Sequence, residues 1–182
     1  MSIFPAAFVR QFRQIRVQVS RRFSSQTGSV SEKLPKEHKF AVEIRNKDWL
    51  VPKLADVLCE HGVALTLIDQ GWMPRPWEMK DKFDLITADF TYVRWLGDRK
   101  GIEEKTTTWD KVIVDRQGDL SEWVSLLKKI QERRIMILAF ANNHYAGFGP
   151  GTVDLFRRLC GMEAPRVAHR PQQKAQQSLL FD

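Results

Sequence analysis

Short apolar runs alternate with amphipathic segments along residues 36–163. The short runs predict strands at residues 40–44, 63–68, 90–96 and 135–140, and apolar positions three and four apart predict helices at residues 49–61, 120–134 and 152–159. The last strand, IMILAF, is apolar at every position, which is typical of a strand buried on both faces. Strands that alternate with helices pair in parallel through crossovers. We therefore predict an α/β fold of about four parallel strands with helices on the outside.

Two longer segments between these elements are predicted to be loops. Residues 70–82 carry tryptophans between prolines, and residues 98–119 are charged and lack apolar periodicity. Loops of this kind often border a ligand site. Tryptophans pack in a core or at its rim more often than they stack on ligands, and the three we single out as stacking candidates are Trp72, Trp77 and Trp95.

The first 31 residues depart from the alternating pattern. Residues 1–23 place apolar side chains at helical spacing beside an arc of arginines, and residues 1–31 contain five arginines and no acidic residue. This composition is typical of a mitochondrial presequence or a membrane-surface helix. An ordinary core helix, or a start that is foreign to the domain, are the alternatives. We divide the chain into a basic amphipathic segment and linker (1–31), a domain (32–163) and a flexible Gln-rich tail (164–182).

The net charge of +7 belongs to the two ends of the chain, because residues 32–163 contain 21 basic and 21 acidic residues. Bulk charge therefore does not favour a nucleic-acid ligand for the domain, although basic arms can add salt-dependent phosphate contacts. No apolar run reaches the roughly 20 residues that a membrane span needs. Cys59 and Cys160 lie in predicted helices without a CxxC partner, which favours buried free thiols in a reducing compartment. We therefore predict a cytoplasmic protein.

Polar side chains stand where each predicted strand ends. Because the carboxyl ends of neighbouring parallel strands meet at one rim, we expect two carboxylates, two guanidinium groups and two amides to converge there. Such arginines can bind a phosphate or carboxylate while an acidic side chain serves as general base. A structural salt-bridge network is the alternative, because a buried arginine needs an acidic partner. The candidate bases are Glu43 and Asp69, and the candidate ligand-binding residues are Arg45, Tyr92, Arg94, Asn142 and Asn143.

His144 follows the two asparagines and is a further ligand-binding candidate, as an acid, a base or a metal ligand. None of the four histidines forms an HExxH or HxH pair, so we predict no metal site and name no cofactor. The glycine-rich turn after it, GFGPG, matches neither the P-loop nor the dinucleotide fingerprint. It still offers backbone N–H groups at a helix N-terminus to an anion.

The chain ends in a glutamine-rich tether with an apolar tip. An apolar tip on a flexible tail is unfavourable in water unless it docks. The stretch QQSLLF resembles the short peptides with which bacterial DNA-repair and replication proteins bind the sliding clamp, with one extra residue. Packing of the tail on its own domain is the alternative. The partner-binding candidates are Gln176, Leu179, Leu180 and Phe181.

Three blocks in a fixed order resemble the family catalogued as domain of unknown function 72, the YecE-like proteins: FAVEIRNKDW at 40–49, DFTYVRWLG at 89–97 and FANNHYAGFGPGTVDLF at 140–156. The resemblance covers about residues 34–161. It implies a TIM-type β/α barrel without an established reaction, whose shape has suggested kinship with metal-dependent DNA-repair endonucleases and sugar isomerases. The motif residues of the family fall on Glu43, Arg45, Trp49, Asp69, Tyr92, Arg94, Asn142 and Asn143.

The sequence departs from the family pattern at Leu96, where relatives usually have His, and at Gly149 and Gly151, where they often have Ala. A complete barrel takes roughly 250 residues, and four strand signals correspond to its C-terminal half. We therefore expect a partial TIM-type barrel from a truncated or frame-disrupted gene product, or a homodimer in which two copies complete one barrel.

Three functional hypotheses follow. The first is a protein that binds a phosphate-containing ligand or nucleic acid at the strand ends, and that is a hydrolase if it is an enzyme. The second is a non-catalytic DNA-associated adaptor that docks on a sliding clamp through its tail. The third is an inactive remnant of a larger barrel.

Overall fold

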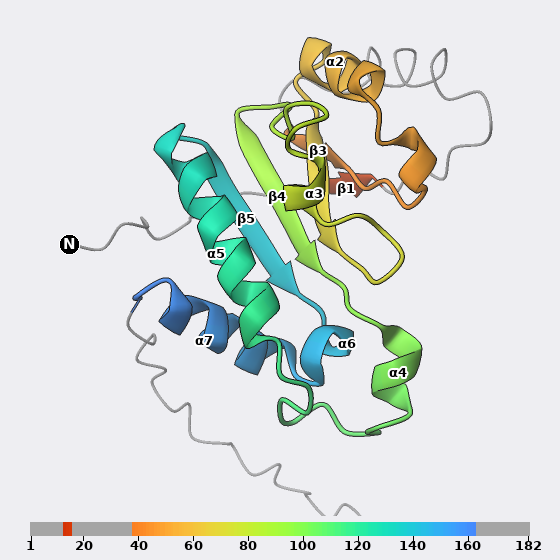
Figure 1. Ribbon diagram of the computed structural model, residues 1–182, viewed down its shortest axis with the longest axis vertical. Helices are drawn as coiled ribbons and strands as arrows, with labels where there is room; N and C mark the ends of the chain where they lie inside the picture. The colour runs from red at the N-terminus through yellow and green to blue at the C-terminus, as the bar shows by residue number, and fades with distance from the viewer. Residues whose placement is uncertain (1–12, 16–37, 163–182) are drawn as a thin grey trace, which may run out of the picture.

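Five parallel strands form one sheet in which the spatial order is also the chain order. The computed structural model describes residues 13–15 and 38–162 (Figure 1). The strands are β1 (Arg13–Ile15), β2 (Phe40–Val42), β3 (Ala64–Asp69), β4 (Phe90–Trp95) and β5 (Met136–Ala141). The helices are η1 (Lys47–Trp49), α2 (Pro52–Glu60), α3 (Pro76–Met79), α4 (Arg99–Glu103), α5 (Gln117–Glu132), α6 (Asn143–Ala146) and α7 (Gly149–Leu159).

The four predicted strands are confirmed, and their parallel pairing makes the chain an α/β protein with consecutive β/α units. The expected burial of the last strand on both faces is wrong, because only Leu138 of β5 is buried. This is the architecture of a partial TIM-type barrel, in which every strand runs in the same direction. The arrowheads of β4 and β5 point toward α4 and α6, so these two short helices lie at the carboxyl end of the sheet (Figure 1). Sites in such folds are built at this end.

The helical spacing of the apolar residues in 1–23 does not lead to a helix at residues 13–15, which form β1. This strand pairs in parallel with β2, and Arg13 lies opposite Phe40. Backbone pairing at a sheet edge overrides the helical spacing of the apolar residues, because intrinsic propensity is a weak preference that tertiary contacts outweigh. The rest of the segment lies outside the described residues, as do Gln176, Leu179, Leu180 and Phe181.

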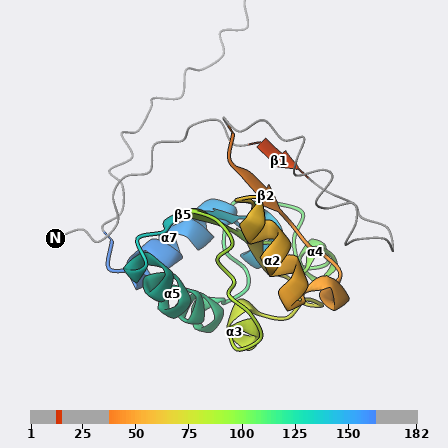
Figure 2. The same cartoon turned by 90° about the horizontal axis from the view of Figure 1, so that it is seen from above.

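The helices α2, α3 and α5 cover the same face of the sheet (Figure 2). Alternate residues of the strands point to this outer face, because side chains in a strand alternate between its two sides. Leu65 of β3 packs with Leu54 and Leu58 of α2. Further along the sheet, Leu67 and Val93 belong to the core that α5 and α7 close.

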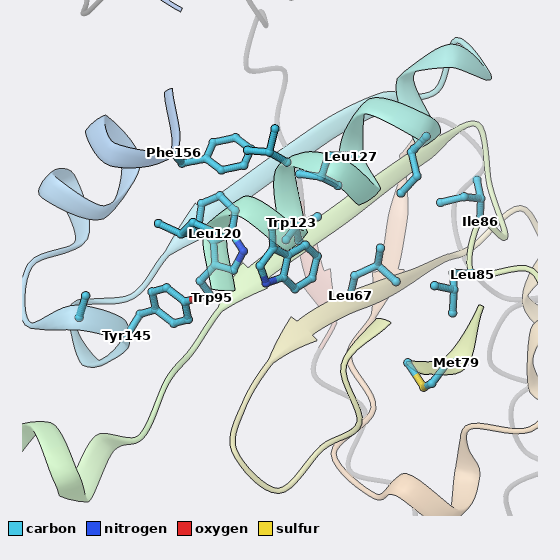
Figure 3. Packing of buried hydrophobic residues seen from close by; sticks show 14 residues of the cluster. Leu67, Met79, Leu85, Ile86, Trp95, Leu120, Trp123, Leu127, Tyr145 and Phe156 are labelled. Atoms are coloured by element: carbon cyan, nitrogen blue, oxygen red, sulfur yellow. The ribbon is translucent and has the colours of Figure 1, made fainter. Parts of the chain in front are cut away.

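An aromatic cluster fills the outer core between β4, α5 and α7 (Figure 3). The rings of Trp95 and Trp123 meet edge to face with their centroids 6.1 Å apart, and the Phe156 ring lies 4.7 Å from Trp95. Trp95 and Trp123 are each at most 1% exposed. Trp77 packs edge to face on Trp123 from the rim of this core, so of the three stacking candidates Trp95 is buried and Trp77 is partly buried.

The inner face of the sheet carries the other set of side chains. At its base it is apolar, with Ala41, Ala64 and Phe90 packed together. Toward the carboxyl end it becomes polar, because Tyr92 and Arg94 of β4 follow Phe90 on the same side. No helix within residues 38–162 lies on this face, and pairing of two copies to complete a barrel stays a prediction.

The two predicted loops contain short helices. Residues 70–82 include the four residues of α3, and residues 98–119 include α4 and the first turn of α5. The helices α3 and α4 are each too short for an apolar period to be visible in the sequence. Cys59 and Cys160 are free, as predicted, but Cys59 is exposed rather than buried.

Candidate functional site

A buried carboxylate holds two guanidinium groups at the carboxyl end of β2 and β4. The Glu43 side chain is 1% exposed, and its Oε1 accepts a hydrogen bond from Arg45 Nε at 2.7 Å. Its Oε2 accepts from Arg94 Nη1 at 2.5 Å. Among the described residues, this cluster contains two guanidinium groups and one carboxylate. Because arginine has five N–H donors in a fixed fork, each guanidinium can meet Glu43 and still face an anion.

The aromatic pair of Tyr92 and Phe140 lies beside this cluster on the inner face. Their rings stack with centroids 4.9 Å apart and an interplanar angle of 24°. Burial raises the pKa of the Tyr92 hydroxyl, Arg94 opposes the rise, and Glu43 adds to it. The phenol therefore remains protonated at neutral pH and available as a hydrogen-bond donor.

A cavity of 340 Å³ opens at the ends of β4 and β5, and Arg94 is part of its wall. Phe140, Asn142 and Asn143 also line it. Phe140 is 45% exposed, which is unusual for a ring of this size in a packed sheet. The cavity thus combines a guanidinium group, two amides and an apolar ring, a set that can hold an anion together with an apolar moiety.

The two asparagines owe their positions to the turn that follows β5. Asn142 is the N-cap of α6, and its Oδ1 accepts from the backbone N–H of His144 at 3.1 Å. Asn143 Oδ1 accepts from the backbone N–H of Gly149 at 2.8 Å, which ties α6 to the start of α7. Asparagine is preferred at such caps because its short side chain can satisfy an orphan backbone donor. Both asparagines line the cavity, and these two hydrogen bonds use only their side-chain oxygens.

His144 joins α6 to α4. Its Nδ1 lies 2.9 Å from Asn142 Oδ1, and its Nε2 lies 3.1 Å from Glu103 Oε1. The Trp109 ring meets the imidazole edge to face with centroids 4.9 Å apart. Both ring nitrogens contact side chains of the protein, and these contacts connect α6 to α4.

Asp69 does not join the other polar residues. It follows Leu67 on the outer face, where its Oδ2 accepts from Trp123 Nε1 at 2.8 Å and from the Tyr145 hydroxyl at 3.0 Å. Oδ1 forms an ion pair with Arg75. The expectation that all strand-end residues meet in one pocket is therefore wrong for Asp69, because neighbouring side chains along a strand point to opposite faces.

Tyr145 is fully buried beside Asp69. Burial raises the pKa of its hydroxyl, Asp119 adds to the rise, and Arg116 and Arg75 oppose it. The phenol therefore stays protonated and donates a hydrogen bond to Asp69. The contacts of Asp69 with Trp123 and Tyr145 therefore link β3, α5 and α6 inside the outer core.

The described residues offer no built metal centre. Within residues 38–162, no group of three or more His, Cys, Asp and Glu side chains is arranged to hold one ion. Both oxygens of Glu43 already contact guanidinium nitrogens, which compete with a cation for the same carboxylate.

Sequence reasoning missed two contributors to this region. Phe140 was expected only as the end of a buried strand, but it is an exposed part of the cavity wall. Glu103 fell in an expected loop, and α4 brings its carboxylate to His144. Phe140 lies opposite Arg94 in the β4–β5 register, so both side chains point to the same face of the sheet. This pairing is the signal that could have placed Phe140 in the cavity wall.

Comparison with known proteins supports the architecture. The sequence model of the family described as "Protein of unknown function DUF72" matches residues 5–177 of the chain. The chain belongs to the DUF72 family. The match begins at residue 5, whereas we expected the resemblance to begin at about residue 34, and that expectation is wrong. The strand β1 therefore lies within the DUF72 region.

Two solved DUF72 structures are similar to this chain. A DUF72 family protein from Enterococcus faecalis V583 has a TM-score of 0.58 and 12% identity, over 83% of this chain and 58% of its own. A DUF72 family protein from Thermotoga maritima MSB8 has a TM-score of 0.55 and 20% identity, over 79% of this chain and 54% of its own. The chain thus spans somewhat more than half the length of these DUF72 structures, and the likeness shows the shared fold. A search of the curated proteins found no match. In the described residues, no helix is long and apolar enough to cross a membrane.

Proposed function

We propose that this DUF72 protein binds a phosphate-containing ligand at the carboxyl ends of β2, β4 and β5. The observation that carries the proposal is the position of Arg94. Its guanidinium lies in the wall of the 340 Å³ cavity and is held by a buried carboxylate rather than by solvent. Arginine forks match the oxygens of phosphate groups, and the neighbouring asparagine amides supply further donors.

Glu43 has a positioning role in this proposal. Each of its oxygens accepts a hydrogen bond from an arginine, and the two arginines are thereby set at a fixed separation on the inner face. A general base needs an oxygen that faces the reacting proton. Asp69 is excluded from this role by its place on the outer face, in contact with Trp123 and Tyr145. The proposal therefore names binding, and a hydrolytic step would need a base other than these two carboxylates.

The ligand class agrees with the charge of the site. Among the described residues, the cluster has two guanidinium groups against one carboxylate, and this excess of positive charge attracts an anion. Tyr92 adds a protonated hydroxyl, and Phe140 offers a ring face beside the anion. Phosphate attached to an apolar or aromatic group, as in a nucleotide or nucleic acid, suits this combination.

Titration calorimetry with inorganic phosphate tests the proposal. We expect binding to the wild type to be lost in Arg94→Ala and weakened in Arg94→Lys, which keeps the charge but not the fork. Arg133→Ala is the matched control, because Arg133 forms an exposed ion pair with Asp84 on another part of the surface. Circular-dichroism melts show whether each variant is folded. Equal phosphate binding by folded Arg94→Ala and wild type would remove Arg94 from the site and overturn the proposal.

A further inference from the structure

A second cavity lies at the same end of the sheet and is built by the loops after β2 and β3. It has a volume of 390 Å³, and Lys47, Trp72 and Lys82 are among the residues in its wall. Trp72 is 59% exposed, which makes it the most exposed large hydrophobic side chain in the part of the chain that the structure describes. The indole therefore offers an open aromatic face at the cavity, on which a flat ligand can stack.

The charges around this ring favour an anionic partner. Neither Lys47 nor Lys82 forms an ion pair within residues 38–162, whereas Asp48 is the one acidic residue of the wall. The wall therefore has a formal charge of +1 (2 − 1). A flat ring flanked by cationic groups fits a ligand that has an aromatic face and a phosphate, because bases stack on tryptophan while lysines contact the backbone.

The two cavities are neighbours. A small apolar cluster of Ile68, Met73 and Leu96 has Leu50 packed against it. Leu50 and Met73 line the cavity around Trp72, whereas Leu96 lines the cavity around Arg94. One extended ligand can therefore cross this apolar cluster and occupy both sites.

We propose that Trp72 is a stacking platform for a nucleobase, and that the ligand of this protein is a nucleotide unit of single-stranded nucleic acid whose phosphate lies at Arg94. This inference rests on the proposed phosphate site and adds the class of the ligand. Trp72 supplies the aromatic contact, and Lys47 and Lys82 contact the adjacent phosphates.

The test compares a labelled oligothymidylate with a base-free deoxyribose-phosphate strand of the same length, by fluorescence anisotropy. For the wild type, we expect the strand with bases to bind about tenfold more tightly than the base-free strand. For Trp72→Ala this difference disappears, and Trp72→Phe retains part of it. Because Trp72 is mostly exposed, its replacement leaves the core intact.

The lysines are tested through salt dependence. Lys47→Ala and Lys82→Ala each lower the slope of log Kd against log salt by about 0.7, the value for one phosphate contact on a single strand. Lys53→Ala, an exposed lysine on α2, is the control and leaves the slope unchanged. Thymidine monophosphate is titrated in a separate experiment. If it binds as tightly as the oligothymidylate, the ligand is a free nucleotide and the single-strand part of the proposal is overturned. Weaker binding of the monophosphate supports a single strand as the ligand.

The outcomes separate this inference from the phosphate site. If Trp72→Ala and wild type show the same preference for the strand with bases, the stacking platform is overturned, whether or not inorganic phosphate binds. If inorganic phosphate binding requires Arg94 while that preference is unaffected by Trp72, the proposed function stands and the inference fails. Equal loss of inorganic phosphate binding in Trp72→Ala would also contradict it, because phosphate alone has no ring to stack.

Discussion

Arg94 Nη1 donates to Glu43 Oε2 at 2.5 Å, although the two residues are 51 positions apart in the sequence. The contact joins the end of β2 to β4 across the intervening strand β3. Arg45 approaches the other oxygen of the same carboxylate. A single acidic side chain therefore determines where both guanidinium groups lie, and the proposed anion site depends on this arrangement.

Replacement of this carboxylate is expected to destabilise the fold and to weaken the effect of phosphate. Glu43→Gln leaves two partly buried guanidinium groups without their anion, and we expect the free energy of unfolding to fall by about 2 kcal/mol. Added phosphate stabilises Glu43→Gln less than the wild type, because the two arginines lose the carboxylate that positions them and bound ligand favours the folded state. Urea denaturation with and without phosphate measures both effects.

The control for this variant is Glu60→Gln, at an exposed glutamate on α2, which we expect to change stability by less than about 0.5 kcal/mol. Equal stabilisation of Glu43→Gln and wild type by phosphate would contradict the positioning role of Glu43.

Asp69 is expected to matter for stability and not for ligand binding. Asp69→Asn weakens the contacts to Trp123, Tyr145 and Arg75 and leaves Arg75 without a charged partner, so we expect a loss of about 3 kcal/mol. Asp89→Asn, in an exposed pair with Lys39, costs less than about 1 kcal/mol. Denaturation gives the stabilities, and calorimetry on the folded fraction gives the phosphate Kd. A Kd that changes tenfold in folded Asp69→Asn would place Asp69 in the site after all.

Gly97 is expected to tolerate no side chain. Its φ of 71° lies in the left-handed region, and an added Cβ would overlap the backbone of His144 and Tyr145. Gly97→Ala therefore has to move α6 away from β4, and we expect a loss of about 3 kcal/mol in the free energy of unfolding. Gly62 has a similar φ of 61° but open space around it, so Gly62→Ala should cost about 1 kcal/mol. Equal costs for the two variants, measured by urea denaturation, would show that backbone strain alone decides and that α6 does not pack closely on Gly97.

The ion pair of Asp84 and Arg133 gives a pH-dependent contribution to stability. The Arg133 hydrogen bond lowers the pKa of Asp84 below its ordinary value of 3.8, partly opposed by burial. Because the folded pKa is lowered, the contribution is complete above the ordinary pKa and is lost as the pH falls through the lowered one. Both side chains are about half exposed, so the contribution stays below about 1 kcal/mol. Unfolding free energies of the wild type and Asp84→Asn should differ at neutral pH and converge in acid; a constant difference down to the acid limit would contradict the assignment.

The parallel strands were predictable because their apolar runs are long enough to stand out. The run predicted at residues 135–140 is β5 within one residue at each end, and the helix predicted at 120–134 is α5 with an earlier start. β1 could not be predicted in this way. Its three residues are too few to show a period of two, and pairing with β2 rather than local preference makes them a strand.

The candidate site was only partly predictable for a related reason. A strand that is buried on both faces is apolar at almost every position, so its pattern does not tell which side chains point inward. Glu43 and Arg94 were correctly expected to meet, whereas Asp69 was expected beside them and lies on the outer face with Trp123. Alternation along β3 places Asp69 and Ile68 on opposite faces of the sheet. The register of β3 with β4 is needed to say which of these two residues lies on the same face as Arg94.

The central claim, that phosphate binds between the arginines and asparagines at this rim, is tested most directly by mapping its position in solution. Nitrogen-15 NMR follows the side-chain N–H groups of Arg45, Arg94, Asn142 and Asn143 during a titration with inorganic phosphate. We predict saturable shifts of these groups with one common Kd, while the Arg133 side chain serves as an internal reference and does not shift. Shifts that are spread evenly over exposed arginines and lysines, with these four groups unchanged, would contradict the account.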